Sequence, residues 1–111
     1  MSHQSPLLER APQLTSAQRK RLRGLAHDLR PLVQIGKSGL TEGVLAEIDR
    51  ALDDHELIKV RFLAGKEAKE ALVGEIVERL RCGEAGRIGH LSILYRQQRD
   101  PEKRKIRLEP E

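Results

Sequence analysis

A Gly-Lys-Ser-Gly stretch at residues 36–39, called here the GKSG loop, combines a flexible backbone with a positive charge. Its glycines carry no Cβ, so the chain can turn sharply and lie close to another molecule. The loop follows an apolar run at 32–35 and precedes a predicted helix for which Thr41 is a suitable cap. Free N–H groups and the dipole at a helix start favour an anion. These features predict a phosphate contact, with a plain tight turn as the alternative.

No set of residues has the spacing that catalysis needs. Ser38 lacks the G-x-S-x-G elbow, and Pro31 stands where the first glycine of a P-loop belongs. Cys82 and His90 are the remaining nucleophile pair, but nothing in the sequence places them together. The acidic residues and the histidine at 53–56 form a weak metal candidate, because consecutive side chains rarely converge on one ion. We therefore expect a binding protein with no enzymatic activity, no metal and no cofactor.

The charge distribution indicates a polyanionic partner. The chain has 21 Lys and Arg against 17 Asp and Glu, a net charge of +4. Positive charge gathers in residues 15–30 and 87–111, while the middle of the chain is acidic. One Phe and one Tyr are too few for a platform that stacks single strands. No predicted helix presents the Asn or Gln residues that read DNA in the major groove. Recognition of a nucleic-acid backbone remains.

Length and composition are typical of one soluble domain. A chain of 111 residues can bury one modest core, and a single cysteine excludes an internal disulfide and fits a reducing compartment. No apolar stretch approaches the roughly 18 residues of a membrane span. The first residues lack the pattern of a secretory signal. We expect a cytoplasmic protein, a monomer, with no membrane partner and no small-molecule substrate.

The hydrophobic pattern predicts an α/β fold, a single compact α-β-α-β-α-β-β domain with a mixed sheet of about four strands and three helices. A capping box formed by Thr15 and Gln18 starts the first helix, which ends before Pro31. The other helices are predicted at 42–54 and 67–81. The strands are predicted at 32–35, at 57–63, in a short piece around Arg87 and Ile88, and at 91–96.

The predicted helices have faces of different character. One arc of the first helix is apolar and should pack into the core: Leu22, Leu25, Ala26 and Leu29. The neighbouring arc is basic and suits a nucleic acid: Arg19, Lys20, Arg23, His27 and Arg30. A membrane surface would also suit such a helix, but it has no aromatic anchor. The outer faces of the other helices, which include Asp49, Asp53 and Lys69, are expected to be solvated.

Several motifs together resemble the YhbY family, stand-alone bacterial versions of the CRM (chloroplast RNA splicing and ribosome maturation) RNA-binding domain. The resemblance extends over about residues 14–108. The matching motifs are Leu25-Ala26-His27, Pro31, the 35–41 stretch with the GKSG loop, Glu56-Leu57-Ile58-Lys59-Val60, Ile88-Gly89-His90 and Leu94-Tyr95-Arg96. The resemblance implies a fold similar to the C-terminal domain of translation initiation factor three. The chain departs from the family in residues 1–13 and 82–86.

The resemblance also implies a function. Family members associate with precursors of the large ribosomal subunit by binding ribosomal RNA. The RNA-binding residues implied here are Gly36, Lys37, Ser38, Gly39, Arg19, Lys20, Arg23, Arg30, Lys59 and Arg61. The expected organisation is a flexible leader at 1–13, the CRM RNA-binding domain at 14–97, and a basic tail at 98–111 that packs in part through Ile106 and Leu108. A general RNA chaperone without a ribosomal target is the alternative, and an adaptor for ribosomal proteins is a further one.

Overall fold

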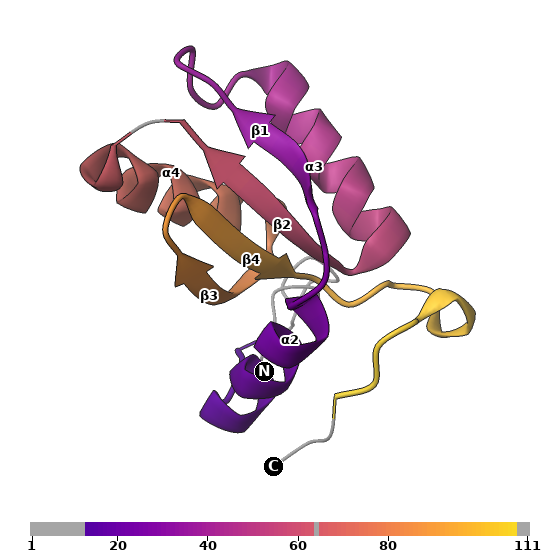
Figure 1. Ribbon diagram of the computed structural model, residues 1–111. Helices are drawn as coiled ribbons and strands as arrows, with labels where there is room; N and C mark the ends of the chain where they lie inside the picture. The colour runs from indigo at the N-terminus through magenta and orange to yellow at the C-terminus, as the bar shows by residue number, and fades with distance from the viewer. Residues whose placement is uncertain (1–12, 64, 109–111) are drawn as a thin grey trace, which may run out of the picture.

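The computed structural model describes residues 13–63 and 65–108 and confirms the predicted order of elements (Figure 1). The leader predicted for residues 1–13 lies, except for its last residue, outside the described residues. The helices are α2 (Ser16–Ala26), α3 (Glu42–His55) and α4 (Lys66–Leu80), followed near the end of the chain by the 3-10 helix η1 (Pro101–Lys103). The strands are β1 (Pro31–Ile35), β2 (Leu57–Phe62), β3 (Gly83–Ile88) and β4 (Leu91–Tyr95).

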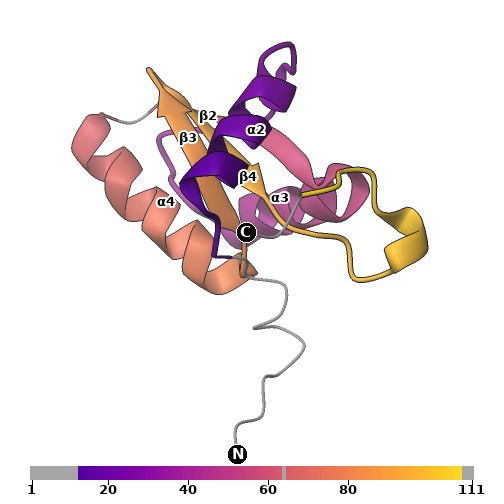
Figure 2. The same ribbon diagram turned by 90° about the horizontal axis from the view of Figure 1, so that it is seen from below.

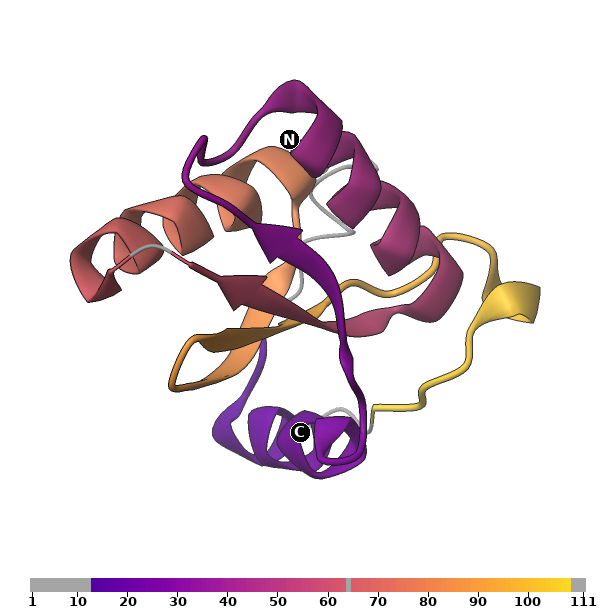
Figure 3. The same cartoon turned by 45° about the horizontal axis from the view of Figure 1, so that its top comes forward.

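The four strands form one mixed sheet in the order β1-β2-β4-β3. Strands β1 and β2 are parallel because α3 carries the chain back between them, whereas β4 runs antiparallel to both β2 and β3. Helices α3 and α4 cover one face of the sheet and α2 lies on the other (Figure 3). The carboxyl ends of β1, β2 and β3 therefore lie at the same end of the sheet, where the GKSG loop follows β1.

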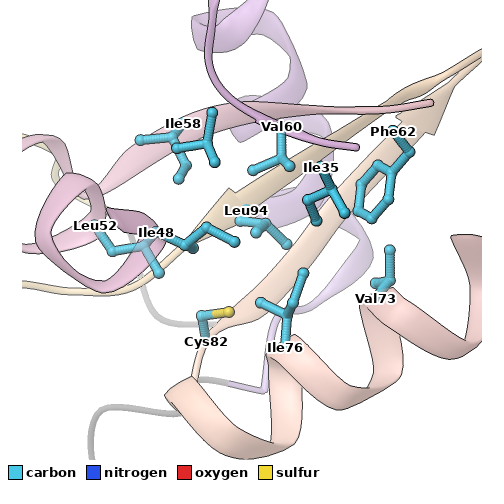
Figure 4. Close-up of a cluster of buried hydrophobic side chains, with 11 residues drawn as sticks. Ile35, Ile48, Leu52, Ile58, Val60, Phe62, Val73, Ile76, Cys82 and Leu94 are labelled. Atoms are coloured by element: carbon cyan, nitrogen blue, oxygen red, sulfur yellow. The ribbon is translucent and has the colours of Figure 1, made fainter. Parts of the chain in front are cut away.

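The main core lies between the sheet and helices α3 and α4 (Figure 4). The period-two pattern predicted for β2 is confirmed, since Ile58, Val60 and Phe62 are buried on this side. Lys59 and Arg61 consequently point to the α2 side of the sheet. The fully formed cluster contains Val33, Ile35, Ile48, Leu52, Ile58, Val60, Phe62, Val73, Ile76, Cys82 and Leu94.

A second, smaller cluster forms under α2. Leu22 and Ala26 pack there against side chains of the sheet: Leu57, Ala85, Ile93 and Tyr95. The capping box predicted for α2 is present, since the Thr15 hydroxyl accepts from the Gln18 N–H at 3.0 Å. The predicted apolar arc is only half right, because Leu25 and Leu29 remain 43% and 39% exposed. The helix ends at Ala26, before Leu29, and it turns Leu22 and Ala26 rather than Leu25 toward the sheet.

Strand β3 is longer than predicted. It begins at Gly83 instead of around Arg87, because the Gly-rich segment packs against α2 rather than forming a loop. Ala85 is buried beneath α2 beside an irregularity in the register. A Cβ on Gly86 would lie 2.6 Å from Cδ of Arg23, so a larger residue here would force the Arg23 side chain to shift.

Arg96 is a buried cation that joins β4 to α3 and α4. Its side chain is 2% exposed and donates to the carboxylates of Asp49 and Asp53, both at 2.8 Å. It also donates to the main-chain carbonyls of Leu80 at 2.9 Å and Asp49 at 3.0 Å. The prediction that Asp49 and Asp53 are merely solvated is wrong. A guanidinium removed from water needs such acceptors, since burying an unpaired charge is costly.

Glu56 is a buried anion that holds the C-terminal tail. Its carboxylate accepts from the backbone N–H groups of Gln98 and Lys105, each at 2.7 Å, and of Ile106 at 2.9 Å. The residue ends α3 with φ of +64° and is buried, so the expectation of a solvated helix end at 53–56 is wrong for Glu56. Ile106 and Leu108 thereby reach the second cluster. Burial, with the nearby Glu56 charge, raises the pKa of Tyr95 to about 12.

Lys69 also differs from the prediction of solvated outer helix faces. The sequence pattern placed it among solvated residues of the third helix, but its side chain is buried. Its ammonium group donates to the carbonyls of Gly89 at 2.7 Å and Leu91 at 2.9 Å. Lys69 therefore fastens the turn between β3 and β4 to α4.

We expect Arg96→Ala to lower the free energy of unfolding by about 3 kcal/mol, because it removes a buried cation that joins three elements and takes the donor from the Leu80 carbonyl at the end of α4. Urea unfolding followed by circular dichroism measures the change. Arg99→Ala is the matched control and should stay within about 0.5 kcal/mol of the wild type, since Arg99 is exposed. Equal losses for both variants would contradict a structural role for the Arg96 contacts.

Candidate nucleic-acid interface

The GKSG loop is a tight turn between β1 and α3. The Gly39 N–H donates to the Gly36 carbonyl at 3.0 Å, and Gly39 has φ of +75°, which a residue with a Cβ adopts only with strain. Thr41 caps α3 as predicted, with its hydroxyl accepting from the Val44 N–H at 3.1 Å. Lys37 and Ser38 project from the turn and are exposed. The loop is therefore held from both sides while its two central side chains face solvent.

Gly36 is not required by the fold. A Cβ built at this position meets no atom within 4 Å, and its φ is not positive. Among the described residues, no hydrogen bond engages the side chain of Lys37 or of Ser38. The acidic residue nearest in sequence, Glu42, pairs with Arg79 at 3.2 Å. The loop thus offers an open backbone and an unpaired ammonium group, which is the arrangement that an approaching phosphate needs.

The sheet extends the basic surface beyond the loop. Lys59 and Arg61 lie on the α2 side of β2, and Arg61 is directly opposite Gln34 of β1. Arg30 immediately precedes β1, outside α2, so its predicted place on the helical arc is wrong. The helix ends at Ala26, and Arg30, as the residue before Pro31, favours an extended conformation that leads into the strand. Arg30, Lys59 and Arg61 consequently gather around β1 and β2.

Helix α2 places its basic residues differently. Arg23 donates to the Ala85 carbonyl at 3.1 Å, over β3, and Arg19 donates to the Leu14 carbonyl. Arg21 donates to the Arg107 carbonyl at 3.1 Å. Lys20 is exposed and points away from the sheet-facing residues Leu22 and Ala26. The predicted helical stripe is therefore partly used in packing, and α2 lies over β3 (Figure 2).

The structure does not bring the candidate catalytic residues Cys82, His90 and Ser38 together. Cys82 is buried in the main core, and His90 lies in the turn at the other end of β3, roughly 20 Å away along a strand of this length. Ser38 is exposed in its loop. Within residues 13–63 and 65–108, no three His, Cys, Asp or Glu side chains form a group that could hold a metal ion. In the same part of the chain, no helix is long and apolar enough to span a membrane.

The sequence matches the CRS1/YhbY (CRM) domain over residues 14–96. The chain belongs to the CRS1/YhbY (CRM) domain family. The matched segment runs from the residue before the α2 cap to Arg96, so this CRM domain contains every residue predicted to bind RNA, and the family resemblance of the sequence motifs is confirmed.

Relatives of this CRM-domain protein carry RNA-binding names. An RNA-binding protein of Haemophilus influenzae is 48% identical over 84 residues, covering 75% of this chain and 85% of the relative. A probable RNA-binding protein of Pseudomonas aeruginosa is 42% identical over 91 residues, covering 81% and 88%. A solution structure of a hypothetical Staphylococcus aureus protein, described as a candidate RNA-binding protein, superposes with a TM-score of 0.73 at 33% identity. That match covers 86% of this chain and all of the other.

Sequence reasoning missed two kinds of residue. It did not identify Arg96 and Glu56 as buried charges, although Asp49 and Asp53 stand one helical turn apart and so mark a face that could hold a cation. It also did not notice that Leu32 and Gln34 must point away from the main core. Their alternation with the buried Val33 and Ile35 is the signal that could have shown it.

We expect the Cys82 thiol to be inert in the folded chain. Burial raises its pKa to about 12, so almost no thiolate forms at neutral pH, and the sulfur is out of reach of solvent. An aromatic disulfide reagent should modify Cys82 in urea, and in native buffer only at the rate of unfolding. Rapid stoichiometric modification of the native protein would instead reopen the possibility of a reactive cysteine.

Proposed function

We propose that this chain is a non-catalytic RNA-binding protein that associates with precursors of the large ribosomal subunit and assists their assembly. The observation that carries the proposal is a CRM domain in which unpaired basic side chains line β1 from one end to the other. Arg30 precedes the strand, Arg61 lies beside it, and Lys37 follows it. The RNA-binding names of its relatives support RNA as the polyanion.

The contacts that we propose are mainly to phosphates. Gly36 allows the backbone of RNA to approach the GKSG loop, and Lys37 neutralises a phosphate there. Lys59, Arg61 and Arg30 continue the positive surface along the sheet, and Arg19, Lys20 and Arg23 add charge from α2. Contacts of this kind supply affinity more than base specificity. The ribosomal precursor would therefore be selected by RNA shape rather than by a sequence motif.

The mode of action follows from the same surface. A rigid domain that holds RNA by phosphate contacts can keep a segment in place during assembly without breaking any covalent bond. We place this activity in the cytoplasm, with the chain acting as a monomer, the domain at 14–97 making the main contacts and the basic tail at 98–111 in an accessory position. The tail's backbone is fastened to Glu56, which leaves side chains such as Lys103 exposed.

We expect Lys37→Glu to weaken RNA binding about tenfold at low salt without changing the melting temperature, since the side chain is exposed. The dependence of affinity on salt should also become shallower, by about one released ion for the lost phosphate contact. Fluorescence anisotropy with a labelled ribosomal RNA fragment measures both. Arg50→Glu on α3 is the control with the same charge change, and it should bind like the wild type. Unchanged binding by Lys37→Glu would remove the GKSG loop from the interface.

Sedimentation of cell lysate on a sucrose gradient tests the ribosomal assignment. We expect the protein to migrate with the large subunit or its precursors at low salt and to leave them as salt is raised, because phosphate contacts weaken by counterion release. Protein found only at the top of the gradient, even at low salt, would contradict a ribosomal target. A general RNA chaperone would then be the better description, and competition by duplex DNA as effective as by RNA would support it.

A further inference from the structure

The two faces of the sheet differ in how completely they are covered. The large hydrophobic side chains that are exposed in residues 13–63 and 65–108 belong to α2, to the segment after it, to strand positions on the α2 side, or, for Leu63, to the residue directly after β2: Leu25, Leu29, Leu32, Leu63 and Ile88. Helix α2 packs on β3, β4 and Leu57 at the start of β2, and no residue of β1 joins the cluster beneath it. The half of this face at β1 and the carboxyl end of β2, where Arg61 is exposed, is therefore open.

A hollow lies in this open half, beside the edge strand. It has a volume of about 450 Å³ and is lined by Arg30, Pro31, Leu32, Val33, Gln34 and Arg61. That volume is within the roughly 300–1,000 Å³ of small-ligand sites. Leu32 is 50% exposed and Gln34 is exposed, because their neighbours Val33 and Ile35 take the core-facing positions. Neither Leu32 nor Gln34 joins either of the two core clusters found among the described residues.

The lining groups specify the kind of ligand. The guanidinium groups of Arg30 and Arg61 have no acidic partner among the described residues, unlike those of Arg79, Arg87 and Arg96. Two unpaired cations at the rim favour an anion. Between them, Leu32 and Pro31 present an apolar surface, and the Gln34 amide offers both a donor and an acceptor. A negatively charged group, a flat apolar ring and a hydrogen-bonding edge are together the features of a nucleotide.

We propose that this hollow accepts one unpaired nucleotide of the bound RNA. The base lies on Leu32 and Pro31, Gln34 hydrogen-bonds to its edge, and Arg30 and Arg61 hold the adjoining phosphates. The inference rests on the proposed RNA-binding function and adds a preference for unpaired over paired RNA. A paired A-form helix keeps its bases stacked inside, so it cannot place one in the hollow, whereas loops, bulges and ends can. A protein partner would have little need for two uncompensated arginines at the rim.

The position of the hollow fits a continuous path for one RNA strand. It lies alongside β1, and the GKSG loop begins directly after the last residue of that strand. A strand of five residues spans about 16 Å. RNA that contacts Lys37 therefore passes the hollow if it continues along β1 toward Arg30.

The test compares two RNA probes on the full chain. One probe is a labelled hairpin with a single-stranded loop and a 3′ overhang, and the other is a fully paired RNA duplex of equal length. We expect Leu32→Ser to lower affinity for the hairpin about fivefold, the smaller end of the cost of losing one base contact. Affinity for the duplex and the salt dependence of both should stay unchanged, because no phosphate contact is removed. Gln34→Ala should have a smaller effect in the same direction.

Ile88→Ser is the matched control, since it removes an exposed aliphatic side chain from the opposite edge strand of the same sheet. It should bind both probes like the wild type, and thermal unfolding verifies that each variant is folded. If the wild type binds both probes but Leu32→Ser changes neither, or changes both equally, the inference about the hollow fails and the proposed function survives. If the wild type binds neither probe, the proposed function itself fails.

Discussion

Two buried charged residues, Arg96 and Glu56, hold the rest of this domain together. The Arg96 N–H donates to the Glu56 carbonyl at 2.9 Å, so the two residues are adjacent where β4 ends beside β2. The Arg96 side chain ties that point to α3 and α4, and the Glu56 carboxylate ties the C-terminal tail to it. Each charge is surrounded by several partners, which is the condition under which a buried charge is tolerated. This end of the sheet is therefore rigid and closed.

The opposite end of the sheet is also held by hydrogen bonds, but it exposes side chains to solvent. The GKSG loop, the start of α4 and the β3–β4 turn meet there, and Lys69 fastens the turn by two hydrogen bonds to main-chain carbonyls. The loop itself is held by the Thr41 cap and the Gly39 turn while its central side chains remain in solvent. A binding surface mounted on rigid elements loses little conformational entropy when a ligand is bound.

Some basic residues in this domain stabilise the fold, and others remain available to bind RNA. Arg19, Arg21 and Arg23 of α2 donate to main-chain carbonyls, and Arg96 is enclosed by acceptors. Arg30, Lys37 and Arg61 make no such contacts within the described residues. A cation that already satisfies backbone acceptors must give up those bonds to bind phosphate, whereas an unpaired one need not. The group around β1 is accordingly the better candidate for the principal RNA surface.

Sequence by itself determined the elements and their family, because local signals are sufficient for both: the Thr15 and Thr41 caps, the alternation through Ile58, Val60 and Phe62, and the glycines of the GKSG loop. Tertiary structure alone decided which polar residues are buried and which apolar ones are exposed. Glu56 and Lys69 resemble surface residues until the tail and the β3–β4 turn supply their partners. Leu25 and Leu32 resemble core residues, but α2 turns Leu22 and Ala26 to the sheet instead of Leu25, and it leaves Leu32 of β1 uncovered. Periodicity shows which side of a strand or helix a residue occupies, but burial depends on what another segment places against that side.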